Sequence, residues 1–310
     1  MRLGWIWALA LAGTGFCAGA AGAQDLTGTL RKIKDSGAIL IGHRESSIPF
    51  SYFVENDKAV GYAIDLCYLV ADAVKAKLGL EKLEVKLVPV TAANRIQSIL
   101  SGAIDLECGS TSNNLERQKV VSFSNTYFVT ANRFVSKAAL GAQTIEDLKG
   151  KTVVSTIGTT NLKQISDLNG QRHLGLTIIA AKDHAEAFRM LDTGRAAAFV
   201  MDDILLFSLV ANSTAPADYA ISPEALSVEP YGIMLRPQDG AFKKVVDDTL
   251  AGIYRKGELL PIYTKWFLRP IPPNGVDLNV PVSAQLKRVI ESPTDSGDPS
   301  AYMIVTGTAQ

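Results

Sequence analysis

The sequence predicts an α/β protein with two lobes, and three observations support that fold class. Short β-rich runs alternate with helical patterns along most of the chain, which is typical of α/β proteins with largely parallel sheets. The order strand, helix, glycine, strand occurs at 88–108 and again at 178–200, which suggests two similar lobes. The 310 residues, of which 47% are hydrophobic, can bury a large core and correspond to two domains at about 150 residues each.

Residues 1–23 are expected to be a secretory signal peptide. Arg2 supplies the positive start, residues 3–17 are apolar and uncharged, and the small residues at 21–23 fit a signal-peptidase site before Gln24. We therefore expect the mature chain to be exported to the periplasm.

Two other interpretations of this segment remain open. A membrane anchor would need about 20 strongly apolar residues, whereas this run is short and diluted by glycine and alanine. A lipid-modified Cys17 would follow a small residue, whereas Phe16 is bulky. No later window of the sequence is apolar enough to span a bilayer, so the mature protein is expected to be soluble.

The charge balance argues against polyanionic partners. The chain has 31 Lys and Arg against 31 Asp and Glu, and loss of Arg2 with the signal leaves a formal charge of −1. Binding to DNA, RNA or an anionic membrane surface would require a basic excess or a basic stripe. We therefore expect no nucleic acid as a partner.

In the N-terminal half, the expected elements follow one another in βα order. Apolar side chains recur at helical spacing over 64–78, and Gly79 is a suitable C-terminal stop. A shorter helix is expected over 94–100, ending near Gly102. Short apolar runs predict strands at 38–42, 85–90 and 103–108.

A β-rich segment at 125–136 is expected to cross into a second lobe, and residues 228–235 are expected to cross back. Between these crossings, residues 183–191 have a helical pattern that ends near Gly194. Strands are predicted at 151–155, 177–181 and 196–201. Two crossing strands of this kind predict a hinge between the lobes.

The two crossings give the domain boundaries. These are 24–130 and 231–290 for a discontinuous lobe 1, and 131–230 for lobe 2. In the second part of lobe 1, a helix is expected over 240–257, and a second one within 258–267, after Pro261. Residues 291–310 are rich in Ser, Pro, Asp, Gly and Thr, and this composition predicts a disordered tail.

Two cysteines, Cys67 and Cys108, remain after Cys17 leaves with the signal. Cys67 falls in an expected helix and Cys108 at the end of an expected strand, so packing of that helix on that strand would bring them together. In an oxidising compartment they can form a disulfide. Two separate buried thiols are the alternative.

Polar side chains follow the expected strands, where ligands bind in open α/β sheets. They lie in the segments 43–47, 91–95 and 109–113 of the N-terminal half and 158–161, 182–184 and 202–203 of the second half. Two arginines, a histidine, several hydroxyls and one carboxylate pair predict an anion-binding cleft that also holds a counter-charge. Taken singly, each residue is equally consistent with a solvated surface charge or a helix cap.

Catalytic and metal-binding motifs are missing from the sequence. There is no G-x-S-x-G elbow, no H-E-x-x-H and no Walker loop. The three histidines and the two mature cysteines are scattered without metal-ligand spacing. We therefore expect no catalytic residues, no metal and no cofactor.

Four segments carry a family resemblance. They are GHRESSIPFSY (42–52), ECGSTSNNLERQ (107–118), AKDHAEAFRMLDTGRAAAF (181–199) and MDDILL (201–206). They closely resemble the periplasmic glutamate/aspartate-binding proteins of ABC importers, in the polar amino-acid branch of the solute-binding proteins. The resemblance extends from about residue 30 to about residue 290, and it implies a type II periplasmic-binding-protein fold with two crossing strands as the hinge.

The resemblance implies contacts to the α-carbon groups of an amino acid. Arg95, with Ser110, Ser112 and Thr160, would hold the α-carboxylate. Asp202 would hold the α-ammonium.

The resemblance also implies contacts to the ligand side chain. Arg44 and His184 would face its carboxylate, and Phe50 would cover its methylenes. In relatives we expect a hydroxyl residue where this chain has Ala92. Its loss would remove a hydrogen bond of roughly 1–3 kcal/mol if the acceptor is charged.

The expected charges complement a dicarboxylic amino acid. Such a ligand carries two carboxylates and one ammonium at neutral pH, and a desolvated site must pair all three. Arg44 and Arg95 against Asp202 supply two positive charges and one negative charge. Arginine suits both carboxylates because its planar fork can donate two hydrogen bonds at once.

The sequence therefore predicts a monomeric protein that captures L-glutamate or L-aspartate by hinge closure and passes it to an inner-membrane ABC permease. Two alternatives stay open. One is a lyase or dehydratase-like enzyme on the same fold, with His184 or Glu45 as the general base. The other is a ligand sensor for a chemoreceptor.

Overall fold

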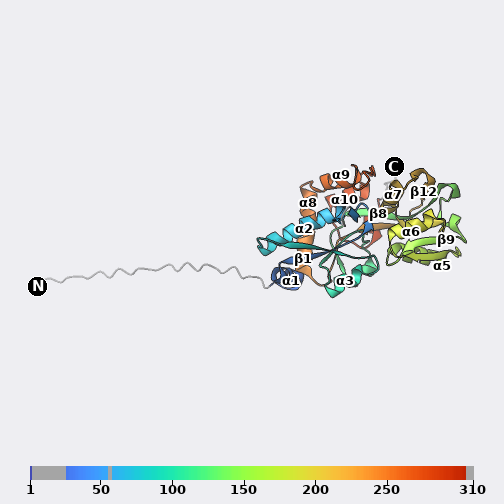
Figure 1. Ribbon diagram of the computed structural model, residues 1–310. Helices are drawn as coiled ribbons and strands as arrows, with labels where there is room; N and C mark the ends of the chain where they lie inside the picture. Colours follow the sequence, from blue (N-terminus) through green and yellow to red (C-terminus); the bar gives the residue numbers. More distant parts are fainter. Residues whose placement is uncertain (2–25, 55–57, 305–310) are drawn as a thin grey trace, which may run out of the picture.

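The computed structural model describes residues 1, 26–54 and 58–304. Apart from Met1, the expected signal peptide lies outside the described residues. Figure 1 shows two α/β lobes side by side, with strand β8 at their junction. Within the described ranges, none of the helices has both the length and the apolar character needed to cross a membrane.

Lobe 1 is built on a five-stranded sheet in the order β5-β1-β6-β14-β7. Its strands are β1 (Ala38–His43), β5 (Glu84–Pro89), β6 (Leu106–Cys108), β7 (Ser122–Phe123) and β14 (Met234–Leu235). The first three run parallel, and His43 pairs with Pro89 on one side and with Cys108 on the other. The loops after β1, β5 and β6 therefore leave the sheet at one edge.

Helices and a small second sheet surround this sheet. The helices are α1 (Gly28–Ser36), α2 (Tyr62–Leu78), α3 (Arg95–Ser101), α4 (Leu115–Gln118), α8 (Gly240–Arg255), α9 (Leu259–Phe267) and α10 (Ala284–Glu291). The small sheet contains β2 (Ser46–Ser47), β3 (Ser51–Val54) and β4 (Lys58–Val60). As predicted, α2 ends at Gly79, whose φ of +62° is the left-handed conformation that glycine favours.

Lobe 2 has a sheet in the order β10-β9-β11-β8-β12, and β13 also pairs with β8. Its strands are β8 (Phe128–Lys137), β9 (Thr152–Thr156), β10 (Thr177–Ala181), β11 (Ala198–Asp202), β12 (Tyr219–Ile221) and β13 (Ser227–Tyr231). Its helices are α5 (Thr160–Gln171), α6 (His184–Asp192) and α7 (Asp203–Ala211). Short 3-10 turns lie at Ala138–Leu140, Ile145–Leu148 and Pro216–Asp218 in this lobe, and at Pro299–Tyr302 near the C-terminus.

The chain crosses between the lobes twice. It enters lobe 2 along β8 and returns along β13, which pairs antiparallel with β8 from Phe128 opposite Tyr231 to Asn132 opposite Ser227. The expected second crossing over 228–235 consists of two strands: β13 belongs to the sheet of lobe 2 and β14 to the sheet of lobe 1. This change of sheet is what makes lobe 1 discontinuous.

The sequence misplaces or misses several elements. Helix α9 begins at Leu259, before Pro261, because proline is tolerated in a first turn whose backbone N–H groups have no helical partner. Helix α7 (DILLFSLVA) is apolar around much of its circumference, so it lacks the amphipathic period that reveals a helix. Helices α1, α5 and α10 and the short strands β2–β4 were likewise not predicted.

The expectation of a disordered tail is wrong for residues 292–304. The Tyr302 side chain is buried, and its hydroxyl lies 2.8 Å from Thr126 Oγ1 and donates to the Ser296 carbonyl at 2.8 Å. The Asp295 carbonyl accepts from the Asn113 amide at 2.8 Å. One aromatic anchor and hydrogen bonds to lobe 1 thus order a segment whose composition alone favours disorder. Residues 305–310 lie outside the described residues.

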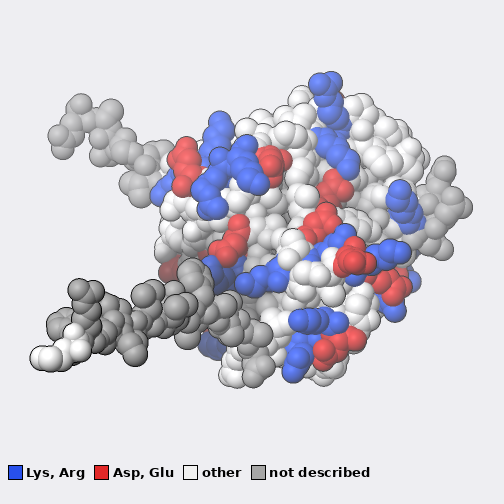
Figure 2. All heavy atoms as spheres, turned by 90° about the vertical axis from the view of Figure 1, so that its left-hand side faces the viewer, with Lys and Arg blue, Asp and Glu red and all other residues white. Residues whose placement is uncertain are grey.

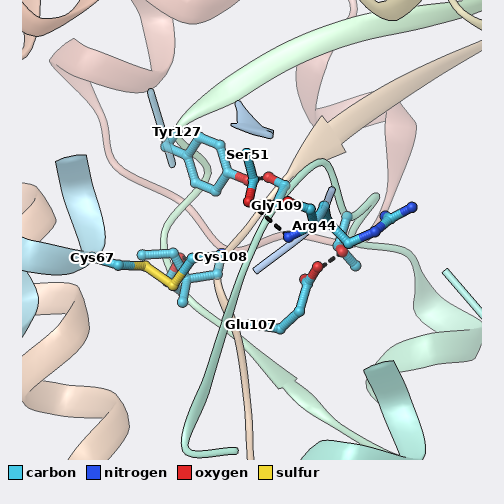
Figure 3. Close-up of a disulfide and its surroundings, with 10 residues drawn as sticks. Arg44, Ser51, Cys67, Glu107, Cys108, Gly109 and Tyr127 are labelled. Atoms are coloured by element: carbon cyan, nitrogen blue, oxygen red, sulfur yellow. Dashed lines mark hydrogen bonds between the residues drawn. A yellow bond between two sulfur atoms is a disulfide. The ribbon is translucent and has the colours of Figure 1, made fainter. Parts of the chain in front are cut away.

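A disulfide joins Cys67 of α2 to Cys108 at the end of β6, with 6.4 Å between their Cα atoms. It lies next to Gly109 and close to Arg44 and Glu107 in Figure 3. Of the two sequence alternatives, the structure thus has the disulfide rather than the separate thiols. The bond fixes the edge of the sheet from which the β6 loop departs.

The surface charges of lobe 1 are mixed in sign. On the face turned to the viewer in Figure 2, basic and acidic side chains alternate rather than separating into large patches of one sign. In α8 of this lobe, Lys244 and Asp248 form an exposed ion pair at 2.8 Å. The neutral composition therefore extends to the distribution of charge over this face.

The packing of Tyr302 gives a test of the C-terminal segment. Tyr302→Ala is expected to lower the free energy of unfolding by about 3 kcal/mol, because it removes a buried aromatic ring. Tyr302→Phe is expected to lower it by about 1 kcal/mol, since it removes hydrogen bonds and keeps the ring. Urea unfolding measures both values. The matched control is Tyr68→Ala at an exposed position, and equal stabilities of Tyr302→Ala and this control would contradict the structure.

Candidate functional site

Seven of the eight predicted ligand contacts line one small cavity between the lobes. The cavity is narrow in this structure: the space that the centre of a water molecule can occupy is about 10 Å³, roughly the room that one water needs. The seven are Arg44, Arg95, Ser110, Ser112, Thr160, His184 and Asp202, and Thr159, Asn161, Met201 and Leu205 complete the lining.

Phe50, the eighth predicted residue, does not line this cavity. Its side chain is fully buried, with ring centroids 4.9 Å from Phe128 and 5.2 Å from Tyr231. The turn between β2 and β3 directs it into the aromatic core, where it supports the strands that cross between the lobes. Met201 and Leu205 provide the apolar part of the lining instead.

Arg95 is the first residue of α3 and is 2% exposed. Its Nη1 donates to Thr111 Oγ1 at 2.6 Å and lies 3.9 Å from Glu107 Oε1. Thr111 in turn donates to Glu107, so a buried carboxylate and a hydroxyl hold one end of the guanidinium. The Nε atom has no hydrogen-bond partner among the described residues.

Arg44 follows β1 and is also buried. Its backbone N–H donates to Ser51 Oγ at 2.8 Å, which fixes the start of the loop (Figure 3). Burial and then the charge of Arg95 lower the pKa of Arg44 to about 10, so it stays positive at neutral pH. Its Nη1 has no partner within the described part of the chain.

His184 begins α6, and its side chain is buried. Burial, followed by the charges of Arg44 and Arg95, holds the pKa of His184 well below its usual value, so the imidazole is neutral. Its Nδ1 lies 2.8 Å from Thr156 Oγ1, whereas Nε2 has no partner in the described residues. When the Thr156 hydroxyl donates to Nδ1, Nε2 carries the proton and can donate it.

Asp202 ends β11 at the opposite side of the cavity. Asn161 Nδ2 donates to its Oδ1 at 2.7 Å, and the Tyr231 hydroxyl donates to its Oδ2. Burial and then the neighbouring charge of Glu229 raise the pKa of Asp202 to about 7, although the two hydrogen bonds act in the opposite direction. Among the described residues no Lys or Arg forms an ion pair with this carboxylate, so no direct cationic contact stabilises its charged form.

The cleft is closed in this structure. The Thr160 hydroxyl of lobe 2 lies 3.4 Å from the Ser112 hydroxyl of lobe 1. Farther along the interface, Asn274 donates to the Asn212 side-chain oxygen at 3.2 Å. The two sets of binding residues thus face each other at contact distance.

Sequence reasoning missed three buried charges around this cavity: Glu107, Arg117 and Glu229. With them, three arginines face three carboxylates, so the expected local charge of +1 becomes zero when all six are ionised. Glu107 and Arg117 lie within the segment 107–118 that carries the resemblance, and this was the available signal. Nothing in the sequence singles out Glu229 on a crossing strand.

The lining of the site combines hydrogen-bond donors from both lobes with the carboxylate of Asp202. Four buried polar atoms of its lining find no partner among the described residues: Arg44 Nη1, Arg95 Nε, Ser110 Oγ and His184 Nε2. Because buried polar groups are nearly always hydrogen-bonded, such convergent atoms indicate a place for an anionic ligand. The described residues contain no group of three or more His, Cys, Asp or Glu arranged to hold a metal ion.

The sequence profile of the bacterial extracellular solute-binding proteins, family 3, matches residues 39–269. The chain belongs to this family. It is a solute-binding protein of the two-lobed type II fold and not an enzyme. The predicted fold class is thereby confirmed.

Curated relatives cover nearly the whole solute-binding protein. The L-glutamate/L-aspartate-binding protein of Pseudomonas aeruginosa is 48% identical over 88% of this chain and 91% of its own length. The glutamate/aspartate import solute-binding protein of Salmonella typhimurium is 45% identical over 91% of this chain and 94% of its own length.

Solved structures give the same architecture. A mutant of ArgBP from T. maritima superimposes with a TM-score of 0.68 at 30% identity, covering 76% of this chain and 98% of that chain. The similarity therefore extends across both lobes.

Proposed function

We propose that this solute-binding protein captures L-glutamate or L-aspartate in the periplasm and delivers it, as a monomer, to an inner-membrane ABC permease. One observation carries the proposal: donor atoms of two arginines and a histidine, which have no partner among the described residues, line one small closed cavity together with one carboxylate. The relatives named for glutamate and aspartate support the same ligand class.

The α-carbon groups of the ligand would lie between the lobes. Arg95 and Ser110 offer donors to the α-carboxylate from lobe 1, and Thr160 offers its hydroxyl from lobe 2. Asp202 accepts from the α-ammonium. The ammonium would give Asp202 a direct cationic partner, so a bound amino acid stabilises its ionised form.

The ligand side chain would be recognised by Arg44 and His184. Arginine can donate two parallel hydrogen bonds to a carboxylate, which an amide of the same shape cannot accept equally. A neutral His184 adds one N–H donor without adding charge. This pair selects an acidic side chain over its amide.

Closure of the lobes would report binding to the permease. Because the lining comes from both lobes, the ligand makes its full set of contacts only when the cleft is closed. A permease that binds the closed form then distinguishes loaded protein from free protein.

The geometry gives no support to the lyase alternative. Glu45, one of its candidate bases, is exposed and does not line the cavity. His184 is held beside Thr156 and faces the two arginines, an arrangement suited to donating a hydrogen bond. The chemoreceptor alternative would use the same closed form, and genes for a permease and an ATPase next to this one would favour transport.

Truncation of the two arginines tests the ligand assignment. Arg95→Ala is expected to weaken binding of every amino acid by roughly 30-fold to 1,000-fold, because it removes one member of a buried charge pair. Arg44→Ala is expected to weaken glutamate binding similarly while affecting glutamine less. Titration calorimetry with glutamate, aspartate, glutamine and arginine measures both effects. Arg189→Ala, on the exposed side of α6, is the control that should keep wild-type affinity.

Two results of this calorimetry would contradict the proposal. Glutamine bound by the wild-type protein as tightly as glutamate would remove the acidic assignment. Full affinity in both arginine variants would mean that the ligand binds elsewhere.

The raised pKa of Asp202 predicts that affinity depends on pH. The α-ammonium lowers this pKa on binding, so binding near pH 7 releases a proton. Affinity should be highest above pH 7 and fall as the pH drops below it, by up to about tenfold per pH unit. Calorimetry from about pH 5.5 to about pH 8.5, in buffers of different ionisation enthalpy, measures affinity and proton release. Constant affinity with no proton release would contradict the assignment of the ammonium to Asp202.

A further inference from the structure

Arg117 joins the two lobes beside the cavity without lining it. It lies in α4 of lobe 1, where its backbone N–H is held by the N-cap Asn114 at 2.8 Å. Its Nη1 donates to the Ser112 carbonyl of the same lobe at 2.8 Å. Its Nη2 donates to the Gly158 carbonyl of lobe 2 at 3.2 Å. One planar guanidinium therefore bridges the loops that carry Ser112 and Thr160.

The backbones of the two lobes approach each other closely at Gly158, in the turn between β9 and α5. A methyl group added there would lie 2.5 Å from the Ala92 carbonyl oxygen and 2.6 Å from Ala93 Cα, both backbone atoms of lobe 1. Its φ of +79° is also a conformation that favours glycine. The closed cleft thus depends on a glycine at this point.

We propose that Arg117 is a latch, a positioning residue that holds the closed cleft together by bridging Ser112 and Gly158 across the entrance. This role of Arg117 rests on the proposed function in one respect: it requires that a small ligand is held between the closed lobes. It adds a residue that controls release without touching the ligand. When the lobes are closed, the backbone of Ala92 in lobe 1 packs against Gly158 in lobe 2, next to the hydrogen bond that Arg117 donates to Gly158.

The surroundings of Arg117 suit this role. Its side chain is nearly buried, and Glu229, Glu107 and Asp202 are the acidic groups that stabilise its charge. Because the hydrogen bond to Gly158 exists only when the lobes are closed, it opposes opening and leaves first encounter with the ligand unchanged. The rate constant of release, koff, should therefore depend on Arg117 far more than the association rate constant, kon.

The test is stopped-flow kinetics on Arg117→Lys and Gly158→Ala. Lysine keeps the charge but lacks the planar fork that reaches two carbonyls at once. Each variant is expected to raise koff roughly tenfold to a hundredfold, the effect of one hydrogen bond to a charged group, with kon changed less than about threefold. The ligand is whichever of glutamate, aspartate, glutamine and arginine the wild-type protein binds most tightly. If that is glutamine or arginine, the acidic assignment fails while the latch is still tested.

Gly150→Ala is the matched control for Gly158→Ala. Gly150 lies in the same lobe with a similar φ of +73°, but a methyl group there meets nothing within 4 Å. Backbone strain alone should therefore leave koff at the wild-type value. Equal increases of koff in Gly150→Ala and Gly158→Ala would overturn the proposed contact.

The double variant tests whether both residues act through one contact. Arg117→Lys with Gly158→Ala should raise koff about as much as the larger single change, and two effects that multiply would overturn the latch. The thermal midpoint of ligand-free Arg117→Lys should match that of the wild type. An unchanged koff in Arg117→Lys would overturn the latch. A lower midpoint with parallel changes in kon and koff would show that Arg117 has a structural role instead.

Discussion

The guanidinium groups of Arg44 and Arg95 are buried in the cleft, out of contact with water. Their burial constrains which residues can surround them. Removing an ion from water costs several kcal/mol unless partner charges and hydrogen bonds replace the solvent. Glu107 of β6 and Thr111 of the loop after it meet part of this requirement. Donor atoms of both arginines have no partner within the described part of the chain, an arrangement that an anionic ligand would complete.

The fold satisfies this constraint by aligning strand ends. In lobe 1, the register of β1 with β5 and β6 brings Arg44, Arg95 and Ser110 to one edge of the sheet. The disulfide anchors the end of β6, and aromatic rings support the crossing strands. In lobe 2, the parallel strands β9, β10 and β11 present Thr160, His184 and Asp202 in the same way, so closure forms one site from two similar edges.

The parts of the site that follow strand ends could be predicted from the sequence, because hydrophobic periodicity reveals where strands stop and which polar residues come next. Glu107, Arg117 and Glu229 could not, since charged residues are usually exposed and their burial depends on tertiary packing. Their charges change the expected net charge of the site from +1 to zero when all six groups are ionised. A proton on Asp202 changes this net charge again. Phe50 and Tyr302 were misjudged for the same reason: packing partners distant in sequence decide their positions.

The orientation of the bound ligand tests the central claim most directly. A crystal structure of the protein with L-glutamate is predicted to show the α-carboxylate on Arg95, the α-ammonium on Asp202 and the side-chain carboxylate on Arg44 and His184. A structure in which the side-chain carboxylate makes no contact with Arg44, or in which glutamate lies outside the cleft, would contradict the account.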